Sequence, residues 1–325
     1  CSSDLKAGLG DRAITRDLSW GVPVPLPNAK GKVLYVWFDA VLGYISATRA
    51  WSAAQGKADA WKDWWLKKGY AAVEGGADVV QEDTEYVAFI GKDNIVFHTL
   101  MFPSMLHAHG DYILPTHVPA NEFLNLQGQK FSKSRNWSID VRDALLALPT
   151  PEQRDALRYC IAMNFPETRD SDFSWPDFQL RTNNELAAIF GNFVHRCTQF
   201  IHDRFNGVVP TPANEALIDE WKRVVEACEQ GADLNERGAP TDDAYALLDA
   251  DDVQFISALV NGMQRIVRHY TMFRFRDALS ETMNLARAAN KYFNDTQPWK
   301  TVKTEPERCA RSEEHTSELQ SRQYL

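Results

Sequence analysis

The sequence predicts an α/β layer of the Rossmann type followed by an all-α helix bundle. A β-branched and aromatic run at 33–38 is typical of a buried strand, and a second run at 86–90 leads through a glycine turn into a helical pattern over 95–107. From about residue 183 onward, apolar residues recur every three or four positions, as they do in helices that pack on one face. The sequence therefore predicts an α/β part followed by a helical part.

In the first part, strand, glycine turn and helix follow in the order of an α/β sheet. The run at 86–90 is followed by Gly91, Lys92 and Asp93, and then by the helical pattern. Ligands of such sheets gather beyond the carboxyl ends of the strands. We therefore expect the 91–93 turn to lie near a ligand.

The helical part is defined by two apolar stripes. They consist of Phe255, Leu259, Met263, Ile266 and Tyr270, and of Phe275, Ala278, Leu279, Thr282, Leu285, Ala289 and Phe293. The segment 212–252, just before these stripes, is rich in Asp and Glu and is interrupted by glycine and proline. We expect a solvated insertion there, and the alternative is an acidic docking loop.

Composition excludes several classes of protein. The longest apolar runs of the 325 residues are far shorter than the roughly 18 residues of a membrane span, so no membrane partner is expected. The five cysteines are odd in number and never spaced as C-x-x-C, which predicts reduced thiols, a cytoplasmic location and no zinc site in this stretch. His107 and His109 have ligand-like spacing but no third partner, so no metal site is assigned.

The most informative string is K-F-S-K-S-R at 130–135, which follows a turn at Gly128. Lys130 and Lys133, separated by a small hydroxyl residue and a phenylalanine, can place ammonium groups against a polyphosphate. As a charge cluster alone, this segment would be a solvated surface loop. As a string, it resembles the K-M-S-K-S motif of class I aminoacyl-tRNA synthetases, in the form typical of the methionyl-tRNA synthetase family.

Two further strings resemble the same family. W-F-D-A-V-L-G-Y at 37–44 is similar to the strand end that lines the family's methionine pocket, with Val41 in place of the usual proline. G-K-D-N-I-V-F-H at 91–98 is similar to the family's G-K-D-x-x-x-F-H segment. The alternatives are ordinary core aromatics and a structural histidine. The resemblance implies a methionine site formed by Trp37, Ala40, Tyr44, Phe97 and His98.

The helical part carries residues that resemble the family's anticodon readers. Asn192 and Arg196 are four apart and share a helix face, and Trp299 offers a plane on which an unstacked base can rest. The alternatives are a helix-face ion pair and a buried tryptophan. The resemblance implies that all three bind the anticodon.

The resemblance, which extends over about residues 11–300, implies an α/β Rossmann-type catalytic half-domain followed by an all-α anticodon-binding helix bundle. The expected divisions are 1–124 for the second half of the catalytic domain, 125–182 for the lysine loop and stem-contact region, 183–305 for the anticodon-binding domain, and 306–325 for a non-native tail. The family's H-I-G-H motif does not occur in the sequence. We therefore expect a fragment that is inactive by itself.

The implied activity is that of a methionine-tRNA ligase, which uses ATP with Mg²⁺ to activate methionine and then transfers it to tRNA(Met). Lys133, assisted by Lys130, is the expected catalytic group, and the ATP-binding residues are Asp93, Lys130, Ser132 and Lys133. One alternative is another class I synthetase, for isoleucine, leucine, valine or cysteine. The other is a non-catalytic tRNA-binding protein.

Overall fold

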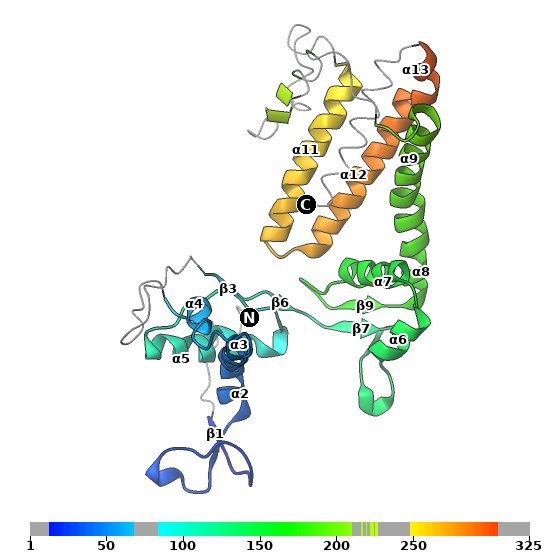
Figure 1. Cartoon of the computed structure of the whole chain (residues 1–325). Coiled ribbons are helices and arrows are strands. Elements are labelled where there is room, and N and C mark those ends of the chain that lie inside the picture. Colours follow the sequence, from blue (N-terminus) through cyan, green and yellow to red (C-terminus); the bar gives the residue numbers. More distant parts are fainter. Residues whose placement is uncertain are drawn as a thin grey trace. The chain divides into compact units, whose positions relative to one another are not determined.

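The computed structural model describes residues 13–67, 84–209 and 248–304, together with positions 216, 219, 222, 223, 225 and 226. The chain divides into two compact units, Cys1–Glu122 and Phe123–Leu325 (Figure 1). The expected tail at 306–325 and most of the acidic segment at 212–252 lie outside the described residues. Among the described residues, no helix is long and apolar enough to cross a membrane.

The first strand expected in unit 1 is shorter than the sequence indicated. Strand β2 (Val33–Leu34) pairs antiparallel with β1 (Thr15–Arg16), and the chain turns into helix α2 (Val36–Asp39) directly after Tyr35. The prediction of a strand through residue 38 is therefore wrong. Because β1 has only two residues, it offers no backbone hydrogen-bond partners to a longer strand. The helical turn that follows places the ring of Trp37 on that of Phe97.

The second expected strand is confirmed as an extended run with parallel partners. β3 (Tyr86–Val87) pairs with β5 (Pro115–His117), and β4 (Ile90–Gly91) pairs with β6 (Ala120–Asn121). Backbone hydrogen bonds from Ala88 to His117 and from Ile90 to Pro119 continue the ladder across the break. Parallel pairing of this kind is typical of an α/β sheet, whose strands are joined by helical crossovers.

The helices of unit 1 cover an aromatic core. They are α2, the 3₁₀ turn Ala40–Leu42, α3 (Gly43–Ala54), α4 (Trp61–Trp65), the 3₁₀ turn Lys92–Asn94, the π-helical turn Phe97–Met101, and α5 (Phe102–His109). The expected helix at 95–107 is confirmed in position, and Gly110, with a φ of 98°, ends it. The buried core consists of Val41, Ile45, Trp65, Phe97, Phe102 and Leu106.

Unit 2 begins with a three-stranded sheet in the order β8-β7-β9. Strand β7 (Leu124–Leu126) pairs antiparallel with β8 (Gln129–Lys130) and parallel with β9 (Ser171–Phe173). The expected turn at Gly128 is present, because Gln127 and Gly128 both have a positive φ. Helices α6 (Val141–Ala147) and α7 (Pro151–Met163) connect the sheet strands, and a capping box of Thr150 and Gln153 begins α7.

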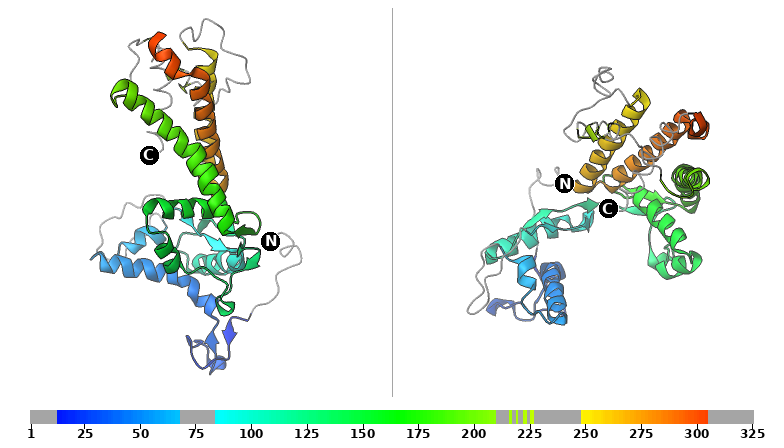
Figure 2. Two further views of the ribbon diagram at one scale, coloured as in Figure 1. Left: turned by 90° about the vertical axis from the view of Figure 1, so that its right-hand side faces the viewer. Right: turned by 45° about the horizontal axis from the view of Figure 1, so that its top comes forward.

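The remainder of the second unit is helical, as expected. Its elements are α8 (Trp175–Arg181), the π-helical turn Thr182–Gly191, α9 (Asn192–Phe205), α11 (Ala250–Thr271), α12 (Phe275–Thr296) and α13 (Pro298–Thr304). Helices α11 and α12 lie side by side in every view (Figures 1 and 2). Gly262 permits this approach, since a Cβ there would lie 2.5 Å from a methyl carbon of Leu285.

Both apolar stripes contribute to the core of these helices. Phe255 and Leu259 of α11 pack with Leu285, Ala289 and Phe293 of α12, and α9 adds Phe193 and Cys197. The rings of Phe255 and Tyr292 stack with centroids 4.3 Å apart. The sequence pattern therefore located the core-facing sides of these helices.

One part of the expected solvated insertion is instead buried. Asp252, in the first turn of α11, is 2% exposed, and its carboxylate accepts a hydrogen bond of 2.6 Å from the Tyr292 hydroxyl. Asp249 caps the same helix through a reciprocal capping box with Asp252. The downstream end of the acidic segment is thus the start of a core helix.

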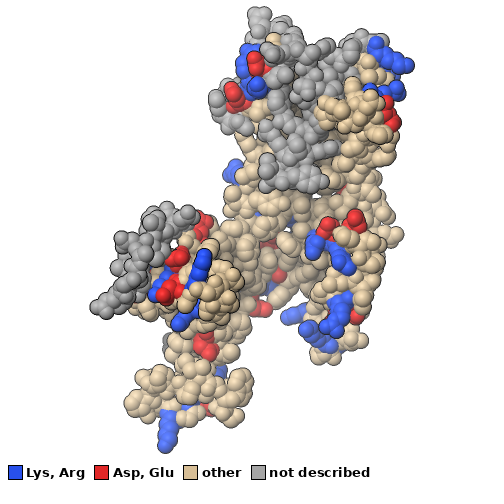
Figure 3. Space-filling view, in the orientation of Figure 1, with Lys and Arg blue, Asp and Glu red and all other residues tan. Residues whose placement is uncertain are grey.

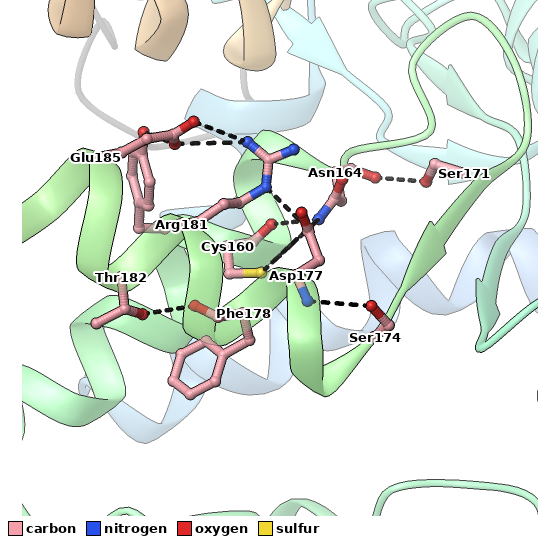
Figure 4. A network of polar contacts seen from close by, with 10 residues as sticks. Cys160, Asn164, Ser171, Ser174, Asp177, Phe178, Arg181, Thr182 and Glu185 are labelled. Carbon is pink, nitrogen blue, oxygen red and sulfur yellow. Dashed lines mark hydrogen bonds and ion pairs between the residues drawn. The ribbon is translucent and has the colours of Figure 1, made fainter.

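A polar network joins α7, α8 and the turn that follows α8 (Figure 4). Asp177 accepts hydrogen bonds of 2.8 Å from Asn164 and from Nε of Arg181, and Arg181 also contacts Glu185. Burial acts to raise the pKa of Asp177, but these hydrogen bonds and the charge of Arg181 outweigh it, so its pKa is lowered. Burial, with the Asp177 charge, raises the pKa of the neighbouring Cys160 thiol to about 11.

Candidate functional site

Two of the unit 1 residues that are expected to bind methionine form a stack of aromatic rings. Trp37 lies on Phe97 with centroids 5.0 Å apart and an interplanar angle of 17°. Phe97 is buried, whereas Trp37 is half-buried and Ala40 is exposed. Val41, which replaces the family's proline, is 2% exposed and packs into the core below this wall. An aromatic wall of this kind suits an unbranched, polarisable thioether.

Tyr44 and His98 form a hydrogen-bonded pair beside this stack. The Tyr44 hydroxyl lies 2.9 Å from Nε2 of His98, and Nδ1 of His98 lies 2.9 Å from the backbone oxygen of Asn94. A carbonyl oxygen can only accept, so Nδ1 carries a proton, and in a singly protonated ring Nε2 accepts from Tyr44. His98 is buried and satisfied at both nitrogens, as the structural alternative predicts, while Tyr44 is 44% exposed and open to a ligand.

Tyr86 lies behind this pair. Its buried hydroxyl has no hydrogen-bond partner among the described residues, and burial, followed by the charge of Tyr44, raises its pKa to about 12. Tyr86 also lines a cavity of about 440 Å³ with Thr48, Trp51, Trp64 and Trp65. None of the five residues that are expected to bind methionine lines that cavity.

Asp93 is exposed and immediately follows a parallel strand. It belongs to the 3₁₀ turn that starts after β4, so its carboxylate lies beyond the carboxyl end of that strand. This is the position in which an α/β protein can hold a ribose hydroxyl. The adjacent Lys92 forms an ion pair with Glu122, after β6. The sequence analysis missed this pair because its members are 30 residues apart.

In unit 2, the lysine loop (residues 130–135) leaves the end of β8. Lys133 is exposed at the start of a 3₁₀ turn (Lys133–Arg135), and the hydroxyls of Ser132 and Ser134 lie 3.2 Å apart. Lys and Arg side chains gather over this part of the unit (Figure 3). The exposed ammonium of Lys133 and the half-buried Ser132 hydroxyl are chemically suited to a phosphate group.

Lys130 has a different environment from Lys133. Its ammonium lies 4.7 Å from the centre of the Phe123 ring, and its backbone oxygen accepts a hydrogen bond of 3.1 Å from Arg135. A cation held over an aromatic ring is attracted by the ring's negative face. Both lysines are exposed, and they differ in that the ammonium of Lys130 lies over a ring whereas Lys133 begins the 3₁₀ turn.

Two of the three residues expected to bind the anticodon, Arg196 and Trp299, lie against the buried ring of Phe293. Arg196 places its guanidinium 4.6 Å from the centre of Phe293, and the ring of Trp299 lies 5.7 Å from the same ring. Asn192 is exposed one helical turn before Arg196 on α9. Trp299 is 40% exposed, so the alternative of a buried tryptophan is wrong.

Two asparagines of α12, which the sequence analysis missed, hold Arg196 in place. The guanidinium donates to Asn294 at 2.6 Å and to Asn290 at 3.5 Å, and Asn290 also donates to the backbone oxygen of Ile189. These contacts are not the helix-face ion pair of the alternative. Because 94 and 98 residues separate Arg196 from its partners, no local sequence pattern could have identified them.

Within unit 1 the structure stacks Trp37 on Phe97 and pairs Tyr44 with His98, and within unit 2 it places Arg196 and Trp299 at the ring of Phe293. Ala40, in unit 1, and Asn192, in unit 2, are exposed in neighbouring turns of the chain. Asp93 belongs to the first unit, and the lysine loop to the second. Among the described residues, no group of three or more His, Cys, Asp or Glu side chains could hold a metal ion.

An α/β unit that is followed by a lysine loop and a helix bundle defines the architecture of class I aminoacyl-tRNA synthetases. The family model for tRNA synthetases class I (M) matches residues 1–198. The chain belongs to this family.

The curated relatives of this chain are named methionine–tRNA ligases. The chain is 46% identical over 304 residues to a methionine–tRNA ligase of Flavobacterium psychrophilum, which covers 94% of this chain and 37% of the relative. It is 46% identical over 316 residues to a methionine–tRNA ligase of Salinibacter ruber, covering 93% and 37%. The chain thus spans little more than a third of the length of these relatives.

Solved structures show the same fold. A methionyl-tRNA synthetase of Mycobacterium tuberculosis bound by methionyl-adenylate aligns with a TM-score of 0.65 and 23% identity, over 97% of this chain and 51% of that one. The free state of the same enzyme aligns with a TM-score of 0.64 and 22% identity, over 98% and 51%.

Proposed function

We propose that this chain is part of a methionine–tRNA ligase, which activates methionine with ATP and transfers it to tRNA(Met). The observation that carries the proposal is the 44–46% identity to methionine–tRNA ligases over 93–95% of the chain. The stack of Trp37 on Phe97 in unit 1 supports methionine as the amino acid. Another class I specificity and a non-catalytic tRNA-binding role are not favoured by these relatives.

In this proposal, methionine lies against Trp37, Ala40 and Phe97. The side chain packs on the stacked rings, because a thioether makes favourable contacts with ring edges. The Tyr44 hydroxyl donates its proton to His98 and therefore accepts a hydrogen bond, as from the ammonium group of the amino acid, at the polar end of the site.

ATP-binding roles are proposed for Asp93 of unit 1 and, separately, for the lysine loop of unit 2. Asp93 accepts hydrogen bonds from the ribose hydroxyls, and Lys130, Ser132 and Lys133 contact the phosphates. When the methionine carboxylate attacks the α-phosphorus, negative charge grows on the departing pyrophosphate, and the ammonium of Lys133 stabilises that charge. Mg²⁺ would enter with ATP, bound to its phosphates and to water molecules.

The helical unit binds the tRNA anticodon. Trp299 offers an exposed ring for stacking, and Arg196 and Asn192 offer hydrogen-bond donors beside it. Phe293, Asn290 and Asn294 fix the direction of the arginine. Cys160 and Cys197 are buried, and reduced cysteines are typical of proteins in the reducing cytoplasm.

The test is methionine-dependent exchange of pyrophosphate into ATP by an enzyme that joins this chain to an H-I-G-H half. Methionine is compared with isoleucine, leucine, valine and cysteine, with and without Mg²⁺. The proposal predicts exchange with methionine and at least about a hundredfold lower kcat/KM for the others. Preference for one of the others, or no exchange with any amino acid, would contradict it.

A further inference from the structure

Trp137 closes the lysine loop at its downstream end. The Ser132 amide donates to the Trp137 carbonyl at 2.8 Å, and the Trp137 amide donates to the Ser132 carbonyl at 2.9 Å. The residues between them form a closed turn, and its last residue, Asn136, has a left-handed φ of 53°. Lys133 is the first residue inside this turn, so its position depends on the bridge.

The side chain of Trp137 ties the turn to the sheet. Its indole Nε1 donates a hydrogen bond of 3.0 Å to the backbone oxygen of Leu126, in β7. The ring is half-buried and packs against the cluster of Leu126, Cys160 and Phe173. Phe131 packs against the same cluster from the other side of Lys133 in the sequence. Both ends of the turn are thus anchored in one apolar cluster.

We propose that Trp137 is a positioning residue for methionine activation, which holds the turn closed and thereby fixes the ammonium of Lys133 for ATP. It acts through the Leu126 hydrogen bond and through the Ser132 bridge. The catalytic consequence rests on the proposed function. The closed turn itself is a property of unit 2 that can be measured without any reaction.

Trypsin measures the closure directly, because the loop contains cleavable bonds after Lys130, Lys133 and Arg135. The probe is Trp137→Phe in an enzyme that joins this chain to an H-I-G-H half, since it removes the indole donor and keeps an aromatic ring. We expect cleavage within the loop to become about fivefold to tenfold faster, and faster still in Trp137→Ala, because local opening becomes easier when a buried bond is unmade. The matched control is Trp175→Phe at the start of α8, whose ring packs on Phe173 and Phe178. In Trp175→Phe we expect trypsin to cleave the lysine loop at the wild-type rate.

Pyrophosphate exchange then tests the catalytic role. Trp137→Phe is expected to lower kcat/KM for ATP about fivefold and to leave the KM for methionine unchanged, a split that general loosening of the fold would not produce. Wild-type cleavage of the Trp137→Phe loop, or equal acceleration in Trp175→Phe, overturns the closure. Faster cleavage with an unchanged kcat/KM for ATP overturns the positioning role. A wild-type enzyme without methionine-dependent exchange refutes the proposed function, and the trypsin comparison still decides the closure.

Discussion

At the scale of single residues, Lys133 combines exposure with a fixed backbone. Its side chain extends from the closed turn, so removing it should leave the fold intact. We expect Lys133→Ala to lower the adenylation rate by about a hundredfold or more while the methionine dissociation constant changes little, because the charge is needed mainly in the transition state. Pyrophosphate exchange and equilibrium methionine binding measure the two quantities.

Lys32→Ala, which removes only a surface pair with Asp17, is the control. Weaker methionine binding at an unchanged rate would contradict the role.

Tyr44 offers a second test at this scale. Tyr44→Phe removes the hydroxyl that faces His98 and leaves the His98 contact with Asn94 in place. We expect the KM for methionine to rise by about threefold to tenfold with a small change in kcat, since one hydrogen bond is worth about 0.5–1.5 kcal/mol. Exchange at varied methionine and saturating ATP measures it. An unchanged KM would place the methionine polar contact elsewhere.

At the scale of elements, the network on α8 couples charge to stability. Arg181→Met leaves the Asp177 carboxylate without its ion pair, and we expect the free energy of unfolding at neutral pH to fall by about 2 kcal/mol. Urea unfolding of the joined enzyme, followed by a probe in unit 2, measures the change. The control is Arg158→Met, because its pair with Asp155 on α7 is exposed and should contribute little.

The same pair has a pH dependence of defined sign. The pKa of Asp177 is lowered in the folded chain, so its stabilisation is complete above the ordinary aspartate value of about 3.9 and is lost as the pH falls through the folded-state value. In Arg181→Met, loss of the arginine moves the folded-state pKa of Asp177 back toward the ordinary value. The wild type should therefore lose more free energy of unfolding than the variant as the pH falls from 7 to 3, so that the difference between the two proteins shrinks. If the free energy of unfolding changed with pH in parallel for the two proteins between pH 3 and 7, the pKa of Asp177 would not depend on Arg181.

The contact between α12 and α13 places Trp299 beside Phe293, remote in sequence from the lysine loop. We expect Trp299→Ala to lower tRNA aminoacylation by about tenfold or more and to leave pyrophosphate exchange nearly intact, since a stacked base is worth about 1–3 kcal/mol. Trp299→Phe, which keeps a ring, should retain most of the aminoacylation. Equal loss of both reactions in Trp299→Ala would mark a structural role.

The elements also show where sequence patterns stop being informative. The helix stripes of α11 and α12 were predictable because their periodicity reports burial directly. Residues 35–38 were not, because strand propensity favoured β structure while packing of Trp37 on Phe97 selected a helical turn. Asp252 was misjudged for a similar reason. Its burial depends on Tyr292, which is 40 residues away.

At the scale of the whole molecule, the strings around Trp37, Asp93 and Lys133 identified the family because each is a local sequence. How Asn290 and Asn294 hold Arg196 could not be predicted, because these contacts join distant parts of the sequence. The hydrogen bond from Trp137 to Leu126 depends on the fold of the sheet and was equally hidden.

The sequence also lacks the H-I-G-H string, and the chain matches only 37% of its relative from Flavobacterium psychrophilum. We therefore expect the chain by itself to show no methionine-dependent pyrophosphate exchange, and the same chain joined to an H-I-G-H half to show it. Exchange by the chain alone would require an ATP site built wholly from these residues.

The first turn of α11 has a consequence for engineering and for the evolution of the family. The capping box of Asp249 and the Asp252–Tyr292 hydrogen bond fix the helix start from within the bundle. The register of α11 therefore does not depend on how many residues precede Asp249, so insertions or deletions upstream need not propagate into the core. A fluorescent protein or an affinity tag spliced between residues 230 and 245 would have a defined helical boundary behind it.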